Sequence, residues 1–201
     1  MAYLVLVRHG QSLWNKQNRF TGWKDVPLSS LGIEEAKKAA KKLKGFKFDI
    51  AYTSVLIRAI DTLKIILRVM KHPKIPIKKD KALNERDYGN LVGMNKYEAR
   101  KVYGIEQVKL WRRSYDTKPP GGESLKDTAQ RTLPYFNKCI MKDLKKGKNV
   151  LVSAHGNSLR SIVMKLDNLS KKEVIALEIP TGVPIVYGIG GKGKVVSKKI
   201  L

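Results

Sequence analysis

Two apolar runs in this sequence each stop at a His-Gly pair. Residues 4–10 read LVLVRHG, and residues 150–156 read VLVSAHG. Short runs of Val and Leu are typical of strands that are buried on both faces of a parallel sheet. Ligands of open α/β sheets bind beyond the carboxyl ends of the strands, so we expect the two histidines to meet at one site.

Strand patterns recur along the rest of the chain. Apolar runs predict strands at 3–7, 48–53, 150–154 and 183–189, with a weaker candidate at 75–78 and a terminal one at 195–201. The sequence GIGGKGKV at 188–195 resembles a phosphate-binding loop, but Val195 replaces the required Ser or Thr. We expect a glycine hairpin between two strands there.

Helical patterns lie between the predicted strands. One helix is expected to start at Ser29 or Ser30 and to end at Gly45, and a second to open at Ser54. A third begins at Ser124 in a variant of the capping box, and Pro134 should kink it or delay its start. Alternating strands and helices predict an α/β fold with three αβα layers and a mostly parallel central sheet of about six strands.

The length of the chain favours one domain. With 201 residues and 42% hydrophobic content, we expect residues 1–201 to bury a single core. The segment 79–122 fits the alternating pattern least well, because it is rich in turn residues and charge. Its aromatic residues argue against disorder, and long excursions of this kind are usually functional, so we expect it to contribute to an active site.

Several features predict a cytoplasmic protein. No apolar run is long enough to span a bilayer, and the segment before Arg8 is too short for a signal peptide. The only cysteine, Cys139, cannot form an intrachain disulfide, which fits a reducing compartment. We expect Cys139 to be a core thiol rather than a nucleophile.

The charge of the chain is strongly positive. There are 41 basic and 17 acidic residues, which give a net charge of +24 and predict attraction to polyanions. Most of the excess is lysine on the polar faces of predicted helices, so biased lysine usage at the surface is the simpler interpretation. Nucleic-acid binding would require basic and aromatic residues interleaved on one face, and we expect no specific nucleic-acid partner.

Arginines accompany the two histidines. Arg8 adjoins His9, and Arg58 is expected in the first turn of the helix that follows YTS. Cations around a histidine oppose a metal ion, whereas guanidinium groups match phosphate oxygens. Each His-Gly pair alone is explained as well by a capped turn, but the combination favours a phosphate site.

Eight motifs together resemble the cofactor-dependent phosphoglycerate mutases of the histidine phosphatase superfamily. They are LVRHGQSLWN, RFTGW, YTSVLIRA, LNERDYG, GMNK, WRR, AHGNSLR and IPTGVP. The resemblance runs in register from residue 3 to about residue 190. The RHG motif alone would indicate only the superfamily, which includes many phosphatases.

The resemblance implies roles for five catalytic residues. His9 would attack phosphorus and carry the phosphoryl group as phosphohistidine. Arg8, Arg58 and His155 would surround the group in transfer, where charge develops on its oxygens. Glu85 would move a proton to and from the substrate hydroxyl. Without the motif, Glu85 would be interpreted as a surface carboxylate that pairs with the neighbouring arginine.

The resemblance also implies a set of substrate-binding residues. Hydrogen bonds around the phosphoryl group would come from Asn15, Gly156 and Asn157. The substrate carboxylate and the second phosphate would be held by Thr21, Gly22, Tyr88, Lys96, Arg112 and Arg113. Ser12 would be a further phosphate donor. The implied primer is 2,3-bisphosphoglycerate, and no metal is required. Relatives form dimers and tetramers, so we expect a homodimer or a higher homo-oligomer.

The sequence departs from the family pattern at three places. Longer members carry an insertion where this chain has only Gly121-Gly122. Gln11 stands where the family often has glutamate, although glutamine is tolerated there. Longer members continue past the last strand as a tail over the active site, whereas this sequence ends at Leu201. Because a covered site excludes water, we expect phosphohistidine to hydrolyse faster here than in tailed relatives.

Three functions therefore remain in competition. The first is a mutase that interconverts 3-phosphoglycerate and 2-phosphoglycerate, and the second is a histidine phosphatase that shares the first half-reaction. The second anion-binding set, Lys96, Arg112 and Arg113, favours the mutase because hydrolysis of a monophosphate does not need it. The third, a nucleic-acid-binding module, rests on the net charge alone.

Overall fold

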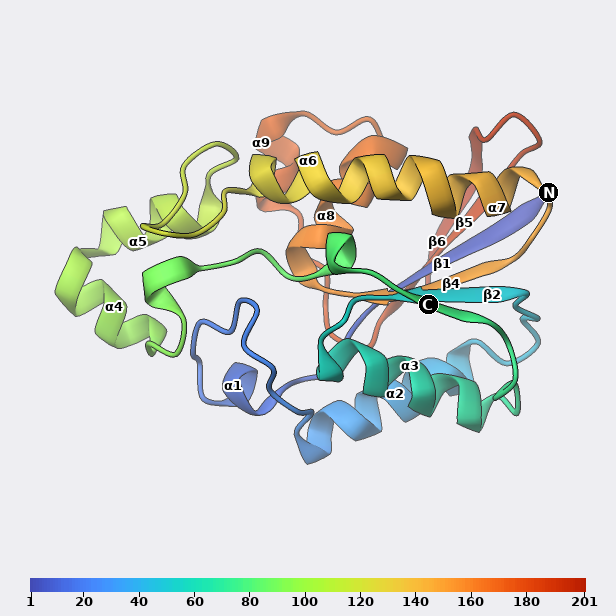
Figure 1. Ribbon diagram of the computed structural model, residues 1–201, viewed down its shortest axis with the longest axis horizontal. Helices are drawn as coiled ribbons and strands as arrows, with labels where there is room; N and C mark the ends of the chain where they lie inside the picture. Colours follow the sequence, from blue (N-terminus) through green and yellow to red (C-terminus); the bar gives the residue numbers. More distant parts are fainter.

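A six-stranded sheet forms the middle layer of the computed structural model, which describes residues 1–201 (Figure 1). The strand order is β3-β2-β4-β1-β5-β6. The strands are β1 (Ala2–Arg8), β2 (Ile50–Thr53), β3 (Ile77–Lys79), β4 (Val150–Ala154), β5 (Pro184–Ile189) and β6 (Val195–Ile200). Each lies where an apolar run predicts it, so the positions of the strands are confirmed.

The sheet is mixed: three of its five strand pairings are parallel, as expected for a mostly parallel sheet, and two are antiparallel. Strands β1, β2, β3 and β4 are mutually parallel, but β5 is antiparallel to both β1 and β6. The chain returns to the carboxyl edge before β5 begins, and the N–H of Gly182 donates a hydrogen bond of 3.0 Å to the carbonyl of Arg8. A strand that starts at this edge must run back against β1. The β5–β6 hairpin confirms that GIGGKGKV is not a phosphate-binding loop.

Helices cover both faces of the sheet (Figure 1). Helices α2 (Ser30–Lys42) and α3 (Ile57–Val69) lie on one face, and α6 (Leu125–Tyr135), α7 (Met141–Lys145) and α8 (Gly156–Leu166) lie on the other. Along β1, Leu4 and Leu6 pack toward α8, and Val5 and Val7 pack toward α2 and α3. Burial of each such side chain stabilises the fold by about 1.5–3 kcal/mol. The three predicted layers are confirmed.

Local signals set the helix boundaries. The Ser29 side chain caps α2, and Ser124 and Asp127 form the predicted capping box of α6. Helix α3 starts at Ile57 rather than at Ser54, because Ser54 is used in the site described below. After Pro134, the helix widens into the π-helical turn η3 (Phe136–Ile140) before α7 begins. The disturbance predicted from Pro134 is this π-helical turn directly after it, whereas the start of α6 at Leu125 is not delayed.

The excursion at 79–122 is ordered around a small core of its own. It contains the 3₁₀ turns η1 (Lys81–Leu83) and η2 (Gly89–Leu91) and the helices α4 (Lys96–Tyr103) and α5 (Ile105–Arg113). Five buried side chains hold it together: Phe20, Leu91, Ala99, Val108 and Trp111. Figure 1 shows α4 and α5 beyond the end of the sheet, on the side where α1 (Leu13–Lys16) lies. The remaining helix is α9 (Lys171–Ala176), and none of the helices is long and apolar enough to cross a membrane.

Two glycines let the loop after β1 rest directly on α2. A Cβ on Gly10 would lie 2.2 Å from the carbonyl oxygen of Gly32, and a Cβ on Gly32 would lie 2.1 Å from that of Gln11. Nearby, the N–H of Gln11 donates to Glu35 at 2.7 Å, and the N–H of Gly10 donates to Thr62 at 3.0 Å. This backbone contact fixes where the chain leaves β1, and therefore fixes the position of His9.

A substitution in α2 tests this contact. Gly-to-Ala replacement inside a helix normally stabilises it by about 1 kcal/mol, but Gly32→Ala should lower the free energy of unfolding by about 1–3 kcal/mol because the methyl group has no space. Urea denaturation measures the change, and Lys38→Ala on the exposed face of α2 is the control. A Gly32→Ala protein as stable as the wild type would show that the loop does not rest on α2 as described.

Candidate active site

The two histidines meet at the carboxyl ends of neighbouring parallel strands. His9 follows β1, and His155 follows β4. Their ring centroids lie 4.9 Å apart with an angle of 59° between the planes, and the residues are only 2% and 0% exposed. The expectation that two distant parts of the sequence bring imidazoles together is confirmed.

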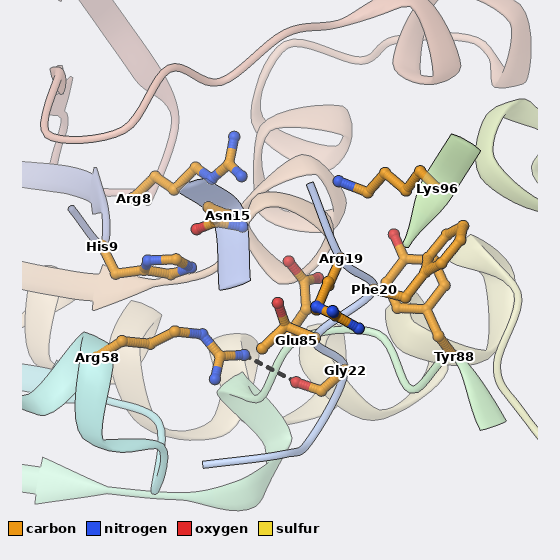
Figure 2. Close-up of a pocket in the computed structure, with 11 residues that line it drawn as sticks. Arg8, His9, Asn15, Arg19, Phe20, Gly22, Arg58, Glu85, Tyr88 and Lys96 are labelled. Carbon is orange, nitrogen blue, oxygen red and sulfur yellow. Dashed lines mark hydrogen bonds between the residues drawn. The ribbon is translucent and has the colours of Figure 1, made fainter. Parts of the chain in front are cut away.

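The surroundings of His9 leave one of its ring nitrogens without a proton. Its Nδ1 lies 2.7 Å from the carbonyl oxygen of Gly10, and because a carbonyl only accepts, Nδ1 carries the proton. Burial and the nearby charges of Arg58 and Arg8 lower the pKa of His9 well below its usual value. The ring is therefore neutral near pH 7, with a lone pair on Nε2. Figure 2 shows the ring between the Arg8 and Arg58 side chains.

His155 lies beside His9 and is oriented by Ser54. Its Nε2 shares a hydrogen bond of 2.7 Å with the Ser54 hydroxyl, while its Nδ1 is buried without a partner. Burial, Arg58 and His9 lower its pKa, so this ring is also neutral near pH 7. Ser54 is not among the residues predicted from the sequence. The motif YTSVLIRA contains it, but no spacing rule links Ser54 to a histidine 101 residues away.

The two arginines nearest to His9 are held by carbonyl groups rather than by carboxylates. Arg58 donates to the carbonyls of Gly22 and Lys24 at 2.8 and 3.0 Å, and Arg8 donates to that of Ile179 at 2.9 Å. Burial lowers the pKa of Arg58 to about 10, which leaves it charged near pH 7. Carbonyl oxygens and neutral imidazoles do not cancel these charges, and the carboxylates of Glu85 and Asp25 offset them only in part. The site therefore attracts an oxyanion.

Glu85 lines the same space, and its side chain is an ionised carboxylate. Its Oε1 accepts hydrogen bonds from the backbone N–H of Asn157 (3.1 Å), the side-chain amide of Asn157 (2.9 Å) and the N–H of Arg86 (2.8 Å). Burial raises the pKa of Glu85, but Arg8 and the bonds from Asn157 and Arg86 outweigh it and lower the pKa overall. Glu85 is 9% exposed, so the alternative of a surface pair with the Arg86 side chain is wrong.

Two adjoining pockets contain most of the predicted residues. Arg8, Glu85, Tyr88 and Lys96 line both of them. The pocket shown in Figure 2 adds His9, Asn15, Arg19, Phe20, Thr21, Gly22 and Arg58, and the other adds Arg112, Arg113, Gly156, Asn157, Arg160, Glu178 and Ile179. Buried polar atoms without partners belong to this region, among them Arg8 Nε and Thr21 Oγ1. The arrangement has room for an anionic group at each end.

Ser12 does not lie where its predicted role requires. It is fully buried and lines neither pocket, and its hydroxyl accepts the N–H of Asn15 as the cap of α1. The expectation that it donates to phosphate is therefore not supported by its position. Asn15 accepts the N–H of Ser12 through Oδ1, and it lines the first pocket.

Three charged pocket residues were not identified from the sequence. Arg19 donates to the carbonyl of Gly93 at 2.7 Å, and Arg160 donates to the side chain of Asn157 at 3.3 Å. Glu178 forms an ion pair with Arg113 and lies 3.6 Å from Arg160. The i, i+3 spacing of Asn157 and Arg160 in AHGNSLR is a signal that could have found Arg160. Arg19 and Glu178 carry no such signal.

A comparison with known families identifies the chain. A family model described as the histidine phosphatase superfamily, branch 1, matches residues 4–199. The chain belongs to the histidine phosphatase superfamily. This match covers both His-Gly motifs and the excursion between them, so the resemblance seen in the sequence is confirmed.

The similar proteins within this superfamily include phosphoglycerate mutases. The chain is 58% identical over 200 residues to the 2,3-bisphosphoglycerate-dependent phosphoglycerate mutase of Parvibaculum lavamentivorans, with 98% of this chain and 95% of the relative covered. It is 54% identical to the phosphoglycerate mutase of Schizosaccharomyces pombe with the same coverage. The solved phosphoglycerate mutase of Bacillus anthracis superposes with a TM-score of 0.79 at 27% identity, over 97% of this chain and 90% of that one.

No group of three or more His, Cys, Asp and Glu side chains in the structure is placed to hold a metal ion. The polar atoms that point into the pockets are mostly nitrogen donors from arginine, lysine, histidine and asparagine. Such donors match phosphate and carboxylate oxygens. The chemistry of the lining therefore fits a small substrate of the superfamily with more than one negative charge.

The burial of two neutral imidazoles predicts how stability depends on pH. Below about pH 6.5 the unfolded chain takes up a proton at His9 and at His155, whereas the folded chain does not. The free energy of unfolding should therefore fall as the pH is lowered, by about 1 kcal/mol per pH unit for each ring between pH 6 and 5. Chemical denaturation at several pH values measures this slope.

Two variants show whether His9 and His155 cause this pH dependence of the free energy of unfolding. His9→Gln together with His155→Gln should flatten the dependence between pH 6.5 and 5.5. His72→Gln, at a histidine outside the pockets, is the control and should retain it. A wild-type protein with a flat profile over this range would contradict the neutral state assigned to the two buried rings.

Proposed function

We propose that the chain is a phosphoglycerate mutase that interconverts 3-phosphoglycerate and 2-phosphoglycerate through a phosphohistidine at His9. The observation that carries this proposal is the neutral His9–His155 pair beside Glu85 and two pockets of positive charge. The names of relatives that are 54–58% identical support the substrate class and the reaction. Those names also support 2,3-bisphosphoglycerate as the primer, which supplies the phosphoryl group that His9 carries.

The lining residues fit a bisphosphate. Arg8 Nε and Thr21 Oγ1 have no partner, and both residues line the pocket that contains His9, where they would bind oxygen atoms of the substrate. Arg112 and Lys96 would bind the other anionic end. Burial together with neighbouring cations lowers their pKa values, although Tyr88 acts in the opposite direction. Removal of one such donor from a transition state costs about 3–4 kcal/mol of barrier in comparable sites.

In the forward step, the residues of the chain exchange one proton and one phosphoryl group. Glu85 takes the proton of the free hydroxyl of the substrate, and that oxygen attacks the phosphorus on His9. The N–P bond breaks, and His9 regains its lone pair. After the bound bisphosphate reorients, His9 Nε2 attacks the other phosphorus, the P–O bond breaks, and Glu85 returns its proton to the oxygen that leaves. The enzyme ends as it began.

A histidine phosphatase is the second candidate, and the second pocket argues against it. Hydrolysis of a monophosphate uses His9, Arg8, Arg58 and His155 but has no use for a second anion-binding set. The carboxylate of Glu178 already neutralises part of this set through Arg113. Arg112 has no such carboxylate partner and is free to bind substrate.

We further propose that residues 1–201 act as one domain, with the excursion at 79–122 as part of its active site. The shared pocket lining supports this, because residues from β1, the excursion and α8 meet in it. A homo-oligomer in the cytoplasm that binds a small phosphorylated metabolite, without specific nucleic acid, is consistent with the mutase function and with the single cysteine.

Mass measurement of the primed enzyme tests the nucleophile. After incubation with 2,3-bisphosphoglycerate, the intact mass of the wild type should increase by one phosphoryl group. His9→Ala should show no increase, since it lacks the attacking nitrogen. A label of equal size on both proteins would place the phosphoryl group elsewhere and would reject His9 as the nucleophile.

Two neighbouring arginines test the second anion site. Arg112→Gln should raise the KM for 3-phosphoglycerate by about 10-fold or more, because it removes a charge-assisted contact of about 1.5–3 kcal/mol. Arg113→Gln is the matched control, and its effect should be smaller because Glu178 already occupies this side chain. Steady-state kinetics in the coupled assay measures both. Unchanged KM values in both variants would favour the phosphatase.

A further inference from the structure

Glu85 lies on a segment with little regular structure. It follows the turn η1 and precedes η2, and its own backbone N–H and carbonyl take part in no backbone–backbone hydrogen bond. The side chain nevertheless has to stay within hydrogen-bond distance of Asn157 to act on a substrate. Side chains from elsewhere in the fold must therefore hold this backbone in place.

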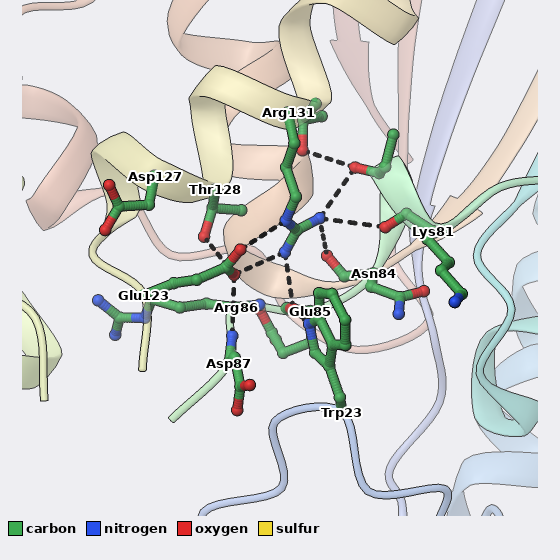
Figure 3. A network of polar contacts seen from close by, with 12 residues as sticks. Trp23, Lys81, Asn84, Glu85, Arg86, Asp87, Glu123, Asp127, Thr128 and Arg131 are labelled. Carbon is green, nitrogen blue, oxygen red and sulfur yellow. Dashed lines mark hydrogen bonds and ion pairs between the residues drawn. The ribbon is translucent and has the colours of Figure 1, made fainter. Parts of the chain in front are cut away.

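Arg131, on α6, supplies most of that support (Figure 3). One of its terminal nitrogens, Nη2, donates to the carbonyl of Glu85 at 2.8 Å. The other, Nη1, donates to the carbonyls of Lys81, Ala82 and Asn84 at 3.3, 3.0 and 3.1 Å. One guanidinium group thus binds four carbonyl oxygens within a stretch of five residues.

Glu123 completes the arrangement from the other side. It receives two parallel hydrogen bonds of 2.8 Å from Arg131, and both side chains are 20% exposed. The same carboxylate accepts the N–H of Asp87 at 3.0 Å. The segment is therefore held on both sides of Glu85, by carbonyl contacts before it and by an N–H contact after it.

Trp23 links this cluster to the loop that holds Arg58. Its indole N–H donates to the carbonyl of Glu85 at 2.6 Å, and its ring lies 5.4 Å from the Arg131 guanidinium carbon. The preceding residue, Gly22, accepts from Arg58. Figure 3 shows Trp23 against the guanidinium, beneath the Glu85 backbone. The cluster thus connects the proton-transfer group with one of the phosphate-binding cations.

We propose that Arg131 is a positioning residue for the mutase reaction, which fixes the Glu85 carboxylate for proton transfer by binding the carbonyl groups of residues 81–85. Arg131 itself lines neither pocket. This inference rests on the proposed function, because it requires Glu85 to act on a substrate hydroxyl.

If Arg131 positions Glu85, replacement of Arg131 should slow only those phosphoryl transfers in which Glu85 has to move a proton. Transfer from 2,3-bisphosphoglycerate to His9 releases a basic alkoxide that Glu85 must protonate. Transfer from an aryl phosphate with a weakly basic leaving group, such as p-nitrophenyl phosphate, needs no such proton. A purely structural role for Arg131 would reduce both transfers alike, whereas a positioning role reduces only the first.

Arg131→Met and Arg131→Lys are the test variants. We expect both to lower kcat for 3-phosphoglycerate by about 10- to 100-fold with KM within about 3-fold, since general acid–base catalysis contributes about 10²- to 10⁴-fold. Lysine keeps the charge but has no planar fork for four carbonyl groups, so it should not rescue. The rate of His9 phosphorylation by p-nitrophenyl phosphate should stay within about 3-fold of the wild type.

The pH profile is a second readout. A Glu85 that loses its contacts with Asn157 stays buried but lacks two donors to its charged form, so the acidic limb of kcat/KM should move to higher pH. Lys198→Met is the matched control. It removes a half-buried ion pair with Asp167 remote from the pockets, and it should change neither kcat nor the acidic limb. If Arg131→Met fails to fold, Trp23→Phe carries the same test, because it removes the other donor to the Glu85 carbonyl.

The outcomes separate the two proposals. The positioning role would be overturned if the wild type is active and the Arg131 variants lose both transfers equally. It would also be overturned if the variants keep the wild-type kcat or the wild-type acidic limb. In each of these cases the mutase function would still stand. A wild type that neither becomes phosphorylated nor converts 3-phosphoglycerate would reject the proposed function, and the positioning role with it. A selective loss of the proton-dependent transfer together with a shifted limb supports both.

Discussion

The active site depends on buried positive charge that no carboxylate neutralises in full. Arg8 and Arg58 are anchored by the carbonyl oxygens of Ile179, Gly22 and Lys24, which fix their positions but leave their charges in place. Burial without an anionic partner is costly for a cation, and a bound phosphate removes that cost. The fold therefore holds a site whose favourable state is the occupied one. The positive charges of Arg8 and Arg58 also oppose protonation of His9 and His155, which helps to keep both imidazoles neutral.

Glu85 shows how the same field supports two kinds of chemistry. The charges that keep His9 neutral also keep Glu85 ionised, so a neutral imidazole and an ionised carboxylate coexist within one buried space. A dianionic phosphate brought beside Glu85 weakens the local positive potential, which favours the protonated carboxyl at the moment when a leaving oxygen needs a proton. One arrangement of cations would thus serve both directions of proton transfer in the proposed reaction.

The sequence was informative where a residue's surroundings are local. Runs of Val and Leu predicted the strands, Ser124 with Asp127 predicted a helix start, and the two His-Gly pairs predicted the site. It was uninformative where a contact depends on tertiary structure. No residue near β5 indicates that this strand runs antiparallel to β1. Arg131 was missed for the same reason, since its partners lie up to 50 residues away along the chain.

The distribution of the two basic residue types explains why the net charge says so little about function. Six of the ten arginines line the pockets. Of the others, Arg86 directly follows Glu85, and Arg131 donates to the carbonyl of Glu85. Of the lysines, Lys96 alone lines either of these pockets. A planar guanidinium binds carbonyl and phosphate oxygens with several fixed donors, whereas an ammonium group keeps its hydration and remains favourable at an exposed surface. The charge of +24 is thus mainly a property of the lysine-rich surface, and the chemistry belongs to a small group of arginines that composition alone does not distinguish from it.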